Sequence, residues 1–231
     1  MIVIITGASR GIGFETCIRF LKNGDVVYAI ARSQIGLDAL KKFEREGDLK
    51  IIKADLSDAQ QLESTLLMIK KTTNHIDLII NNAGYLVNKK FEDTCIEDFD
   101  KSINVNLKTP YFLIQKLLPL LLSSESGQII NIGSMGGYPG SSKFPGLSIY
   151  SAAKGALATF TECLAEELKE KNIKVNCLAL GAVQTEMLEK AFPGYQAPVN
   201  PMEMADFIYG FATHTSKLIN GKVIPVSLIT P

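Results

Sequence analysis

Short apolar runs of strand length alternate with helix-length amphipathic segments along the whole chain. The expected strands are Ile2–Thr6, Val26–Ala31, Leu49–Ala54, Ile76–Asn81, Gln128–Ile132, Val175–Leu180 and Lys222–Val226. The expected helices are Gly11–Asn23, Gln34–Glu46, Asp58–Thr73, Ile96–Ser123, Tyr150–Glu170 and Met202–Thr213. The strand runs are almost wholly apolar, which is typical of strands covered by helices on both faces. This order of elements predicts a parallel sheet with right-handed crossovers.

The chain shows no linker, low-complexity tract or internal repeat. We therefore expect a single α/β domain over residues 1–231. Its fold should be a doubly wound, Rossmann-like parallel sheet of about seven strands with helices on both faces. In such a sheet, ligands bind beyond the carboxyl ends of the strands. The residues that follow each strand are therefore the first candidates for a functional site.

The charges balance, with 24 lysines and arginines against 24 aspartates and glutamates. This balance gives no reason to expect nucleic acid or an anionic membrane as a partner. No apolar run reaches the roughly 18 residues of a membrane span, and the chain enters a strand at once, without the basic flank of a signal peptide. The four cysteines stand far apart, which argues against a disulfide framework or a metal site and favours buried, reduced thiols in a cytoplasmic protein.

The first strand ends in a glycine-rich turn, and a helix follows at once. Glycines let a backbone turn tightly and approach a pyrophosphate, whose charge is met by the helix N-terminus. The spacing is Gly-x-x-x-Gly-x-Gly, which differs from the usual dinucleotide fingerprint. A plain turn that caps the helix is the alternative, but the position between first strand and first helix favours a dinucleotide site. The residues expected there are Gly7, Ser9, Arg10, Gly11, Ile12 and Gly13.

Two arginines indicate which nicotinamide cofactor is used. Arg10 lies inside the glycine turn, and Arg32 follows the second strand directly. An acidic residue ending that strand would bind the ribose 2′-hydroxyl of NAD and repel a 2′-phosphate, but the position holds Ala31. Guanidinium groups suit a phosphate instead. Each arginine alone fits a surface charge, whereas the two together favour NADP(H) over NAD(H).

Two further turns follow strands and are included in the expected cofactor site. Asp55 and Leu56 come after the third strand, where Asp55 either accepts a hydrogen bond from adenine or serves as an acid at a helix N-terminus. Asn82, Ala83 and Gly84 come after the fourth strand, where small residues let a nucleotide approach. An ordinary loop is the alternative for this second turn.

Tyr150 and Lys154 stand four residues apart and share one face of an expected helix. A lysine in that position favours the phenolate of the tyrosine and lowers its pKa from about 10. A tyrosine that gives or takes a proton near neutral pH is what carbonyl and alcohol redox chemistry requires. Taken alone, the pair also fits a solvated helical face.

These motifs, in this order, resemble the short-chain dehydrogenase/reductase family over nearly the whole chain. The matching stretches are Thr6–Gly13, Asn81–Gly84, a serine after the fifth strand and Tyr150–Lys154. The resemblance implies a catalytic tetrad of Asn106, Ser134, Tyr150 and Lys154. No metal belongs to the site that it implies.

The resemblance also implies a role for each member of the tetrad. Tyr150 donates a proton to the substrate carbonyl oxygen as hydride arrives from the nicotinamide, and Ser134 hydrogen-bonds that oxygen. Lys154 binds the nicotinamide ribose and lowers the pKa of Tyr150, while Asn106 holds a water that links Lys154 to solvent. Taken singly, Ser134 also fits a strand-end cap and Asn106 a polar residue at a helix kink.

The later part of the chain departs from the family pattern. Val183 and Thr185 resemble the family's contacts to the nicotinamide carboxamide, although Leu180 replaces the usual proline. The segment Gly136–Gly146 is longer than is common and is expected to form part of a substrate wall. The end, Val226–Pro231, lacks the family's Asp-Gly-Gly finish.

The substrate side of the site is expected to be apolar. The segment Glu186–Asn200, which usually covers the substrate in this family, is short and contains Met187, Leu188, Phe192 and Tyr195. Tyr138 and Phe144 add aromatic side chains from the longer segment before Tyr150. Such a wall suits a compact carbonyl compound, with ordinary loop packing as the alternative.

The leading hypothesis is an NADP(H)-dependent enzyme that reduces a small ketone or aldehyde. An NAD-dependent alcohol dehydrogenase is the alternative within this chemistry, and a catalytically silent nucleotide-binding regulator is the alternative from another class. The resemblance further implies a homodimer or homotetramer built on the long helices Ile96–Ser123 and Tyr150–Glu170. It does not name the substrate.

Overall fold

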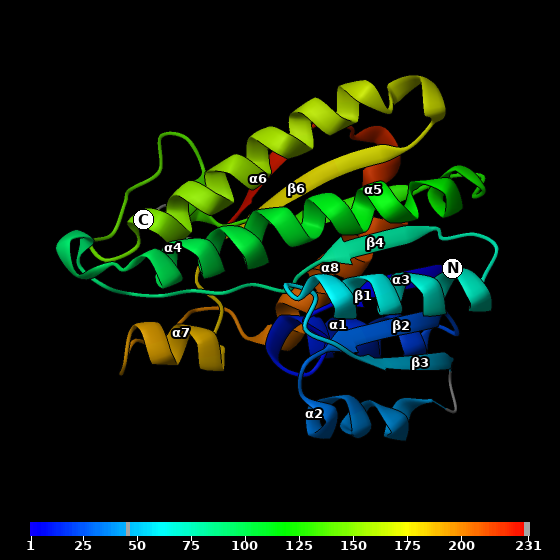
Figure 1. The fold of residues 1–231 in the computed structure, drawn as a ribbon, viewed down its shortest axis with the longest axis horizontal. Helices are drawn as coiled ribbons and strands as arrows, with labels where there is room; N and C mark the ends of the chain where they lie inside the picture. The colour runs from blue at the N-terminus through cyan, green and yellow to red at the C-terminus, as the bar shows by residue number, and fades with distance from the viewer. Residues whose placement is uncertain (45–46, 229–231) are drawn as a thin grey trace.

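The computed structural model, which describes residues 1–44 and 47–228, has one seven-stranded parallel sheet in the order β3-β2-β1-β4-β5-β6-β7 (Figure 1). The strands are β1 (Ile2–Thr6), β2 (Val26–Ala31), β3 (Asp48–Lys53), β4 (Leu78–Asn81), β5 (Gln128–Ile132), β6 (Lys174–Leu180) and β7 (Val223–Val226). The strand order reverses between β1 and β4, so this is the switch point beside which ligands bind in doubly wound folds. The predicted fold class is confirmed.

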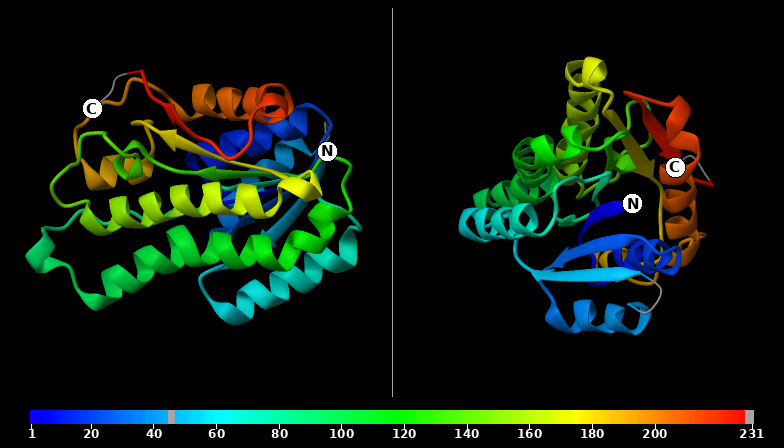
Figure 2. Two further views of the ribbon diagram at one scale, coloured as in Figure 1. Left: turned by 90° about the horizontal axis from the view of Figure 1, so that it is seen from above. Right: turned by 90° about the vertical axis from the view of Figure 1, so that its right-hand side faces the viewer.

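Helices cover both faces of the sheet (Figure 2). They are α1 (Gly11–Lys22), α2 (Gln34–Asp38), α3 (Ala59–Thr72), α4 (Ile96–Ile103), α5 (Thr109–Leu122), α6 (Ser148–Glu167), α7 (Glu186–Ala191) and α8 (Pro201–Thr213). Apolar residues of α1, α2 and α8 form one core with the sheet, and those of α3, α5 and α6 form the other. Neither α4 nor α7 contributes a buried residue to these two cores.

Strand β1 shows why an apolar run suits this architecture. Its side chains alternate between the two faces, so Val3 and Ile5 join the core under α1 and α8. Ile4 joins the opposite core, under α3 and α5. All three are fully buried. Strand β3 differs because it lies at the sheet edge, where Lys50 and Lys53 are exposed.

Two expected helices differ from the structure, and one helix was not expected. The segment predicted as Gln34–Glu46 is α2 followed by a 3₁₀ helix at Ala39–Phe43, and residues 45–46 lie outside the described part. The segment predicted as Ile96–Ser123 is interrupted between α4 and α5 by a π-helical turn. Helix α7 was expected only as a cover over the substrate, because six residues are too few to show a helical period.

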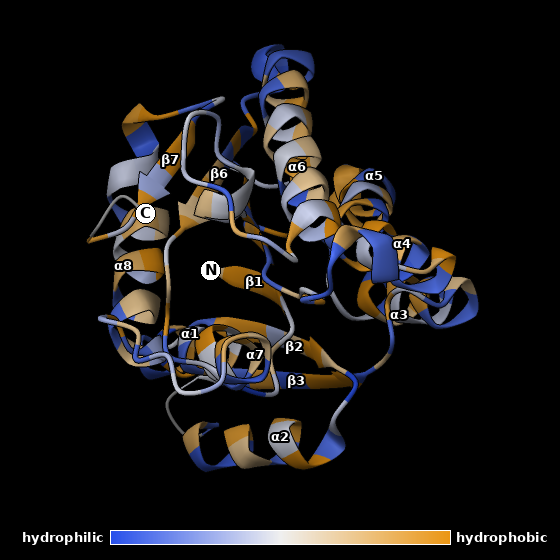
Figure 3. Cartoon of the chain, turned by 90° about the vertical axis from the view of Figure 1, so that its left-hand side faces the viewer, coloured by the Kyte–Doolittle hydropathy of each residue, from blue (hydrophilic) through white to orange (hydrophobic). Residues whose placement is uncertain are grey.

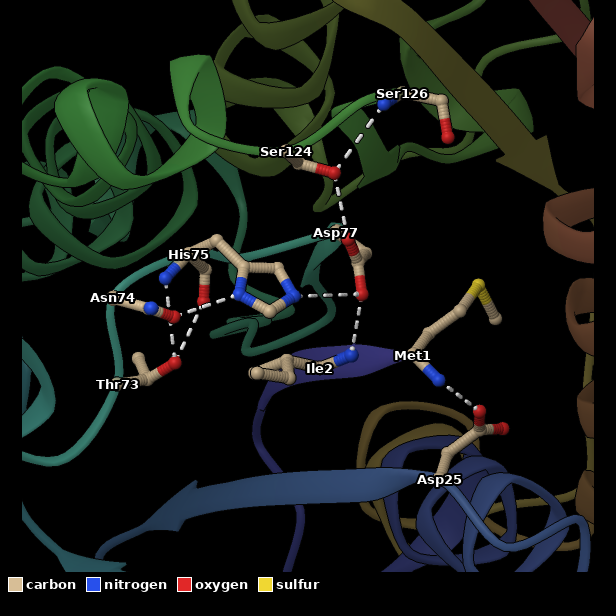
Figure 4. A network of polar contacts seen from close by, with 9 residues as sticks. All are labelled: Met1, Ile2, Asp25, Thr73, Asn74, His75, Asp77, Ser124 and Ser126. Carbon is tan, nitrogen blue, oxygen red and sulfur yellow. Dashed lines mark hydrogen bonds and ion pairs between the residues drawn. The ribbon is translucent and has the colours of Figure 1, made fainter.

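A polar network joins elements at the amino ends of the strands, opposite the expected site (Figure 4). Asp77, just before β4, accepts a hydrogen bond from the Ile2 amide at 2.7 Å and one from the Ser124 hydroxyl at 2.6 Å. His75 approaches the same carboxylate at 3.7 Å. This network ties β1 and the α5–β5 connection to the start of β4, and it gives His75 a structural setting.

The cysteines only partly match the expectation of buried thiols. All four are free, but Cys95 and Cys163 are exposed while Cys17 and Cys177 are buried. Within residues 1–44 and 47–228, no group of three or more histidines, cysteines and acids is placed to hold a metal ion. None of the helices in that part is long and apolar enough to cross a membrane.

Candidate active site

A cavity of about 700 Å³ lies at the carboxyl ends of the central strands. Figure 3 views the molecule from this side, with the hydrophobic strand β1 near the centre. The predicted residues that line it are Gly7, Ser9, Arg10, Gly11, Ile12, Arg32, Asp55, Leu56, Asn82, Ala83, Gly84, Ser134, Tyr150, Lys154, Val183 and Thr185. Among the residues predicted for catalysis and cofactor binding, Gly13 and Asn106 are the two that do not line it.

The glycine turn fits a dinucleotide because side chains are excluded from it. Gly7 has φ +71° and Gly11 has φ +56°, in the left-handed region that favours glycine. A Cβ on Gly7 would lie 2.9 Å from the Cα of Ala83, and one on Gly13 would lie 2.5 Å from the Gly7 oxygen. Gly13 therefore acts by letting α1 start close against the turn, which leaves the turn's backbone open to a pyrophosphate.

Hydrogen bonds hold the glycine turn to the turn after β4. The Thr6 hydroxyl accepts from the amides of Asn82 at 3.1 Å and Ala83 at 3.0 Å. The side-chain amide of Asn82 donates a hydrogen bond to the Thr6 carbonyl at 2.9 Å. Thr6 therefore fixes the spacing of the two turns that would flank the cofactor. The sequence places Thr6 at the start of a motif but did not predict this role.

Each arginine expected to bind the 2′-phosphate faces a carboxylate in this structure. Arg10 lies 3.0 Å from Glu186 at the start of α7, and Arg32 lies 3.7 Å from Asp55. All four side chains are well exposed, so these ion pairs are weak. Glu186 was not foreseen as a partner, because the sequence does not show that α7 returns to the glycine turn.

Asp55 is held as a carboxylate by its own loop. Its Oδ1 accepts from the Ser57 amide at 3.0 Å and the Ser57 hydroxyl at 2.6 Å. Partial burial raises the pKa of Asp55, but the Ser57 hydrogen bonds and the Arg32 charge outweigh it, so the pKa lies below its usual range. Asp55 therefore reaches the cavity wall as an anion.

Tyr150 and Lys154 lie on the first turns of α6 and are 9% and 4% exposed. The Lys154 amine donates to the Ile132 carbonyl at 2.7 Å and lies 6.0 Å from the centre of the Tyr150 ring. Ser134 follows β5, and its hydroxyl accepts from the Gly136 amide at 3.1 Å. The three side chains thus meet on one wall of the cavity that also contains the glycine turn.

Burial shifts the pKa values of Tyr150 and Lys154 in opposite directions, and each shift favours the neutral side chain. The pKa of Tyr150 is raised, because burial outweighs the opposing effect of the Ser134 hydroxyl. The sequence had predicted a lowered pKa for Tyr150. Burial lowers the pKa of Lys154 to about 8, and the nearby Cys177 acts in the opposite direction. The amine points to the Ile132 carbonyl, so its effect on the phenol is small in this state.

Asn106 occupies the π-helical turn Asn104–Lys108 between α4 and α5. Its side chain is fully buried and spans the backbone of Tyr85, accepting from the amide at 3.1 Å and donating to the carbonyl at 2.8 Å. Asn106 therefore lies where the helix is interrupted, but its side chain satisfies the backbone of the loop after β4 and not that of the helix, and the role that the family resemblance implies for it stays a prediction. The same contacts hold the loop after β4 to the turn between α4 and α5.

A buried polar chain beneath the site was not foreseen. Asn81 on β4 donates to Asn131 on β5 at 2.8 Å, and Asn131 donates to the Thr161 hydroxyl on α6 at 2.9 Å. Cys177 on β6 interacts with the same hydroxyl, and burial raises the pKa of its thiol to about 11. This chain locks α6 to the sheet beneath Lys154. An asparagine inside an apolar strand was the available signal.

Three segments line the side of the cavity that the sequence predicts to bind substrate: the β5–α6 connection, the segment after β6 and the residue after β7. Helix α7 begins at Thr185, whose hydroxyl accepts from the Leu188 amide at 3.2 Å. Phe144 and Phe192 line the cavity, whereas Tyr138, expected in the wall, does not. Ser227 also lines it, and a Cβ on Gly181 would lie 2.8 Å from the Ser227 Cβ. The rest of the expected tail, residues 229–231, lies outside the described residues.

Comparison with known proteins agrees with this arrangement. The family model described as short chain dehydrogenase matches residues 1–196. An uncharacterised oxidoreductase of Staphylococcus aureus (strain MW2) is 27% identical over 215 residues, which cover 93% of this chain and 92% of that protein. The Pseudomonas aeruginosa RhlG/NADP active-site complex is similar in structure, with a TM-score of 0.88, 28% identity, and coverage of 98% of this chain and 94% of that one.

A 3-ketoacyl-(acyl-carrier-protein) reductase from Brucella melitensis, complexed with NADH, is similar with a TM-score of 0.87 and 25% identity. The match covers 97% of this chain and 96% of that one. The two solved relatives hold different cofactors, so they do not choose between NADP and NAD. The sheet order, the glycine turn and the matched family model lead to one conclusion: the chain belongs to the short-chain dehydrogenase family of oxidoreductases.

Proposed function

We propose that this protein uses NADP(H) to reduce a small ketone or aldehyde to an alcohol, with Tyr150 as the proton donor. The observation that carries the proposal is the meeting of Ser134, Tyr150 and Lys154 on the wall of the cavity that the glycine turn enters. When bound, the cofactor supplies the hydride that reaches the carbonyl carbon. The protein's task is then to orient the carbonyl and to neutralise the oxygen that gains charge.

Because its pKa is raised, the Tyr150 hydroxyl stays protonated before the hydride is transferred. A developing alkoxide is a stronger base than a phenolate, so it takes the proton from the Tyr150 hydroxyl. The Ser134 hydroxyl donates a second hydrogen bond to the same oxygen. Lys154, when protonated, stabilises the phenolate that remains. Asn106 acts as a positioning residue, because its side chain is occupied by the Tyr85 backbone.

Arg10 and Arg32 support NADP(H), since both line the cavity and no acid ends β2. The competing observation is that Glu186 and Asp55 pair with them, which leaves an NAD-dependent alcohol dehydrogenase as the second candidate. A silent regulator has less support, because all four tetrad residues are present.

A panel of ketones and aldehydes, assayed with NADPH and NADH in parallel, tests the cofactor assignment. Arg32→Ala should raise the KM for NADPH about 10- to 100-fold and leave NADH unchanged, because a charge-assisted phosphate contact is lost. Arg19→Ala is the matched control, because Arg19 pairs with Asp206 of α8 and does not line the cavity. Equal or better turnover with NADH, unaffected by Arg32→Ala, would contradict the assignment.

Two further parts of the proposal concern the protein's setting. Exposed apolar side chains on α4 and α5 support a homodimer or homotetramer; they are Ile96, Phe99, Tyr111, Phe112 and Leu122. The unpaired, exposed thiols of Cys95 and Cys163 fit a reducing compartment such as the cytoplasm.

A further inference from the structure

Charge is confined to the cofactor side of the cavity. The charged residues among the described lining are Arg10, Arg32, Asp55, Lys154 and Glu186. Four of them form the two ion pairs at the glycine turn and at the ends of β2 and β3. Lys154 is buried, with its amine bonded to a strand carbonyl. None of these five is placed to receive a negative group on the far side of the catalytic wall.

The rest of the cavity forms an apolar compartment. The residues that define it are Leu86, Met135, Phe144, Leu147, Phe192 and Tyr195. They come from three separate segments: the loop after β4, the long connection between β5 and α6, and the segment after α7. Apolar and aromatic walls with a few polar groups at one end are typical of sites for small uncharged ligands.

Hydrogen bonds and one ring contact join the three segments, which we call the roof of this compartment. The Asn88 side chain donates to the Ala191 carbonyl at 2.8 Å, and the Lys89 amide donates to the Gly146 carbonyl at 3.1 Å. The rings of Phe144 and Phe192 meet edge to face, with centroids 6.3 Å apart and planes at 66°. The aromatic pair therefore closes the gap between two segments that are distant in sequence.

Two lysines lie near the roof, and neither lines the cavity. Lys89 forms an ion pair with Asp98 at 2.5 Å. Lys143 donates to the Tyr138 carbonyl and the Ser141 hydroxyl, each at 2.7 Å. Both partners of Lys143 are neutral, so its charge is not compensated, but it lines a neighbouring hollow with Ser148 and Ser151 and not the cavity itself. A carboxylate or phosphate entering the compartment would therefore give up its water without a cation on the wall beside it.

We infer that the substrate is an uncharged, apolar ketone carrying one ring, and that Phe144 and Phe192 set its size. This inference rests on the proposed function and makes its substrate class specific. A single ring packs edge to face against the aromatic pair while its carbonyl reaches Ser134 and Tyr150. Keto acids and phosphate-bearing carriers are rejected because none of the described residues that line the compartment is a cation.

The test uses two ligands of nearly the same shape, 4′-nitroacetophenone and 4-acetylbenzoate, which differ in charge. Their affinities for the complex with NADP⁺ are measured by calorimetry, because NADP⁺ has no hydride to give and binding is then read without turnover. The nitro compound should bind at least about 100-fold more tightly. Equal affinity, tighter binding of the carboxylate, or no binding of either compound would overturn the inference.

Phe192→Ala tests the size limit. It should weaken binding of 4′-nitroacetophenone about 10-fold and strengthen binding of the two-ring ketone 2-acetylnaphthalene, because the wall recedes. Phe207→Ala is the matched control, since that ring lies on α8 against Phe211, away from the cavity. An unchanged preference between one and two rings in Phe192→Ala would overturn the role of the aromatic pair.

The two proposals fail in different ways. If 4′-nitroacetophenone binds the NADP⁺ complex as expected but NADPH reduces no carbonyl, the compartment stands and the proposed function fails. If NADPH reduces both acetophenones equally well, the proposed function stands and the charge selection is wrong.

Discussion

The amine of Lys154 has lost much of its basicity to burial, and its pKa of about 8 places its charge within reach of ordinary assay conditions. The spacing of Tyr150 and Lys154 predicted that they share a helix face, and α6 confirms it. The spacing did not predict that the amine would turn to the Ile132 carbonyl, because that acceptor belongs to a strand distant in sequence. The direction of the Tyr150 pKa was missed for the same reason: burial is a property of the fold.

Stability should depend on pH through this lysine. Its folded pKa lies below the ordinary value of 10.5, so the unfolded chain binds more protons between pH 8 and 10.5. Over that window, the wild-type free energy of unfolding should rise relative to Lys154→Met, by up to about 3 kcal/mol. Urea denaturation at several pH values measures this difference. Lys70→Met, on the exposed side of α3, is the control, and curves for Lys154→Met that stay parallel to wild type would contradict the assignment.

At the scale of elements, the interruption between α4 and α5 has a clear physical cause. A regular helix from residue 96 to 123 would satisfy its own backbone, and the apolar period of the sequence predicted that arrangement. The π-helical turn instead places Asn106 where it satisfies both backbone groups of Tyr85. The sequence showed the asparagine but not its partner. Strands β1 and β2 were easier to predict, because they are continuous apolar runs that end at Thr6 and just before Arg32.

Replacing Asn106 should therefore weaken the fold. Asn106→Leu leaves the partly buried amide and carbonyl of Tyr85 without these partners, and each lost partner costs about 1–2 kcal/mol. We expect a loss of about 2–4 kcal/mol in the free energy of unfolding, measured by urea denaturation. Asn104→Leu, in the same π-helical turn, should cost less than about 1 kcal/mol. Equal losses in the two variants would show that the clamp on Tyr85 is not what stabilises this turn.

At the scale of the whole molecule, the two ends of the sheet are used differently. The amino ends are tied by the Asp77 network, while the carboxyl ends open onto the cavity. The sequence predicted most of the cavity lining because most of its motifs directly follow a strand, and parallel strands bring their carboxyl ends to one edge. It did not predict the roof, because the contact of Phe144 with Phe192 depends on how two loops fold over that edge.

The central claim is that Tyr150 donates the proton during NADPH-dependent reduction, and Tyr150→Phe tests it most directly. The measurement pairs NADPH binding, by calorimetry, with single-turnover oxidation of bound NADPH by a ketone that the wild type reduces. NADPH affinity should stay within about threefold of wild type, and the rate should fall at least about 100-fold, because the proton donor is lost. A Tyr150→Phe protein that reduces the ketone within tenfold of the wild-type rate would contradict the claim.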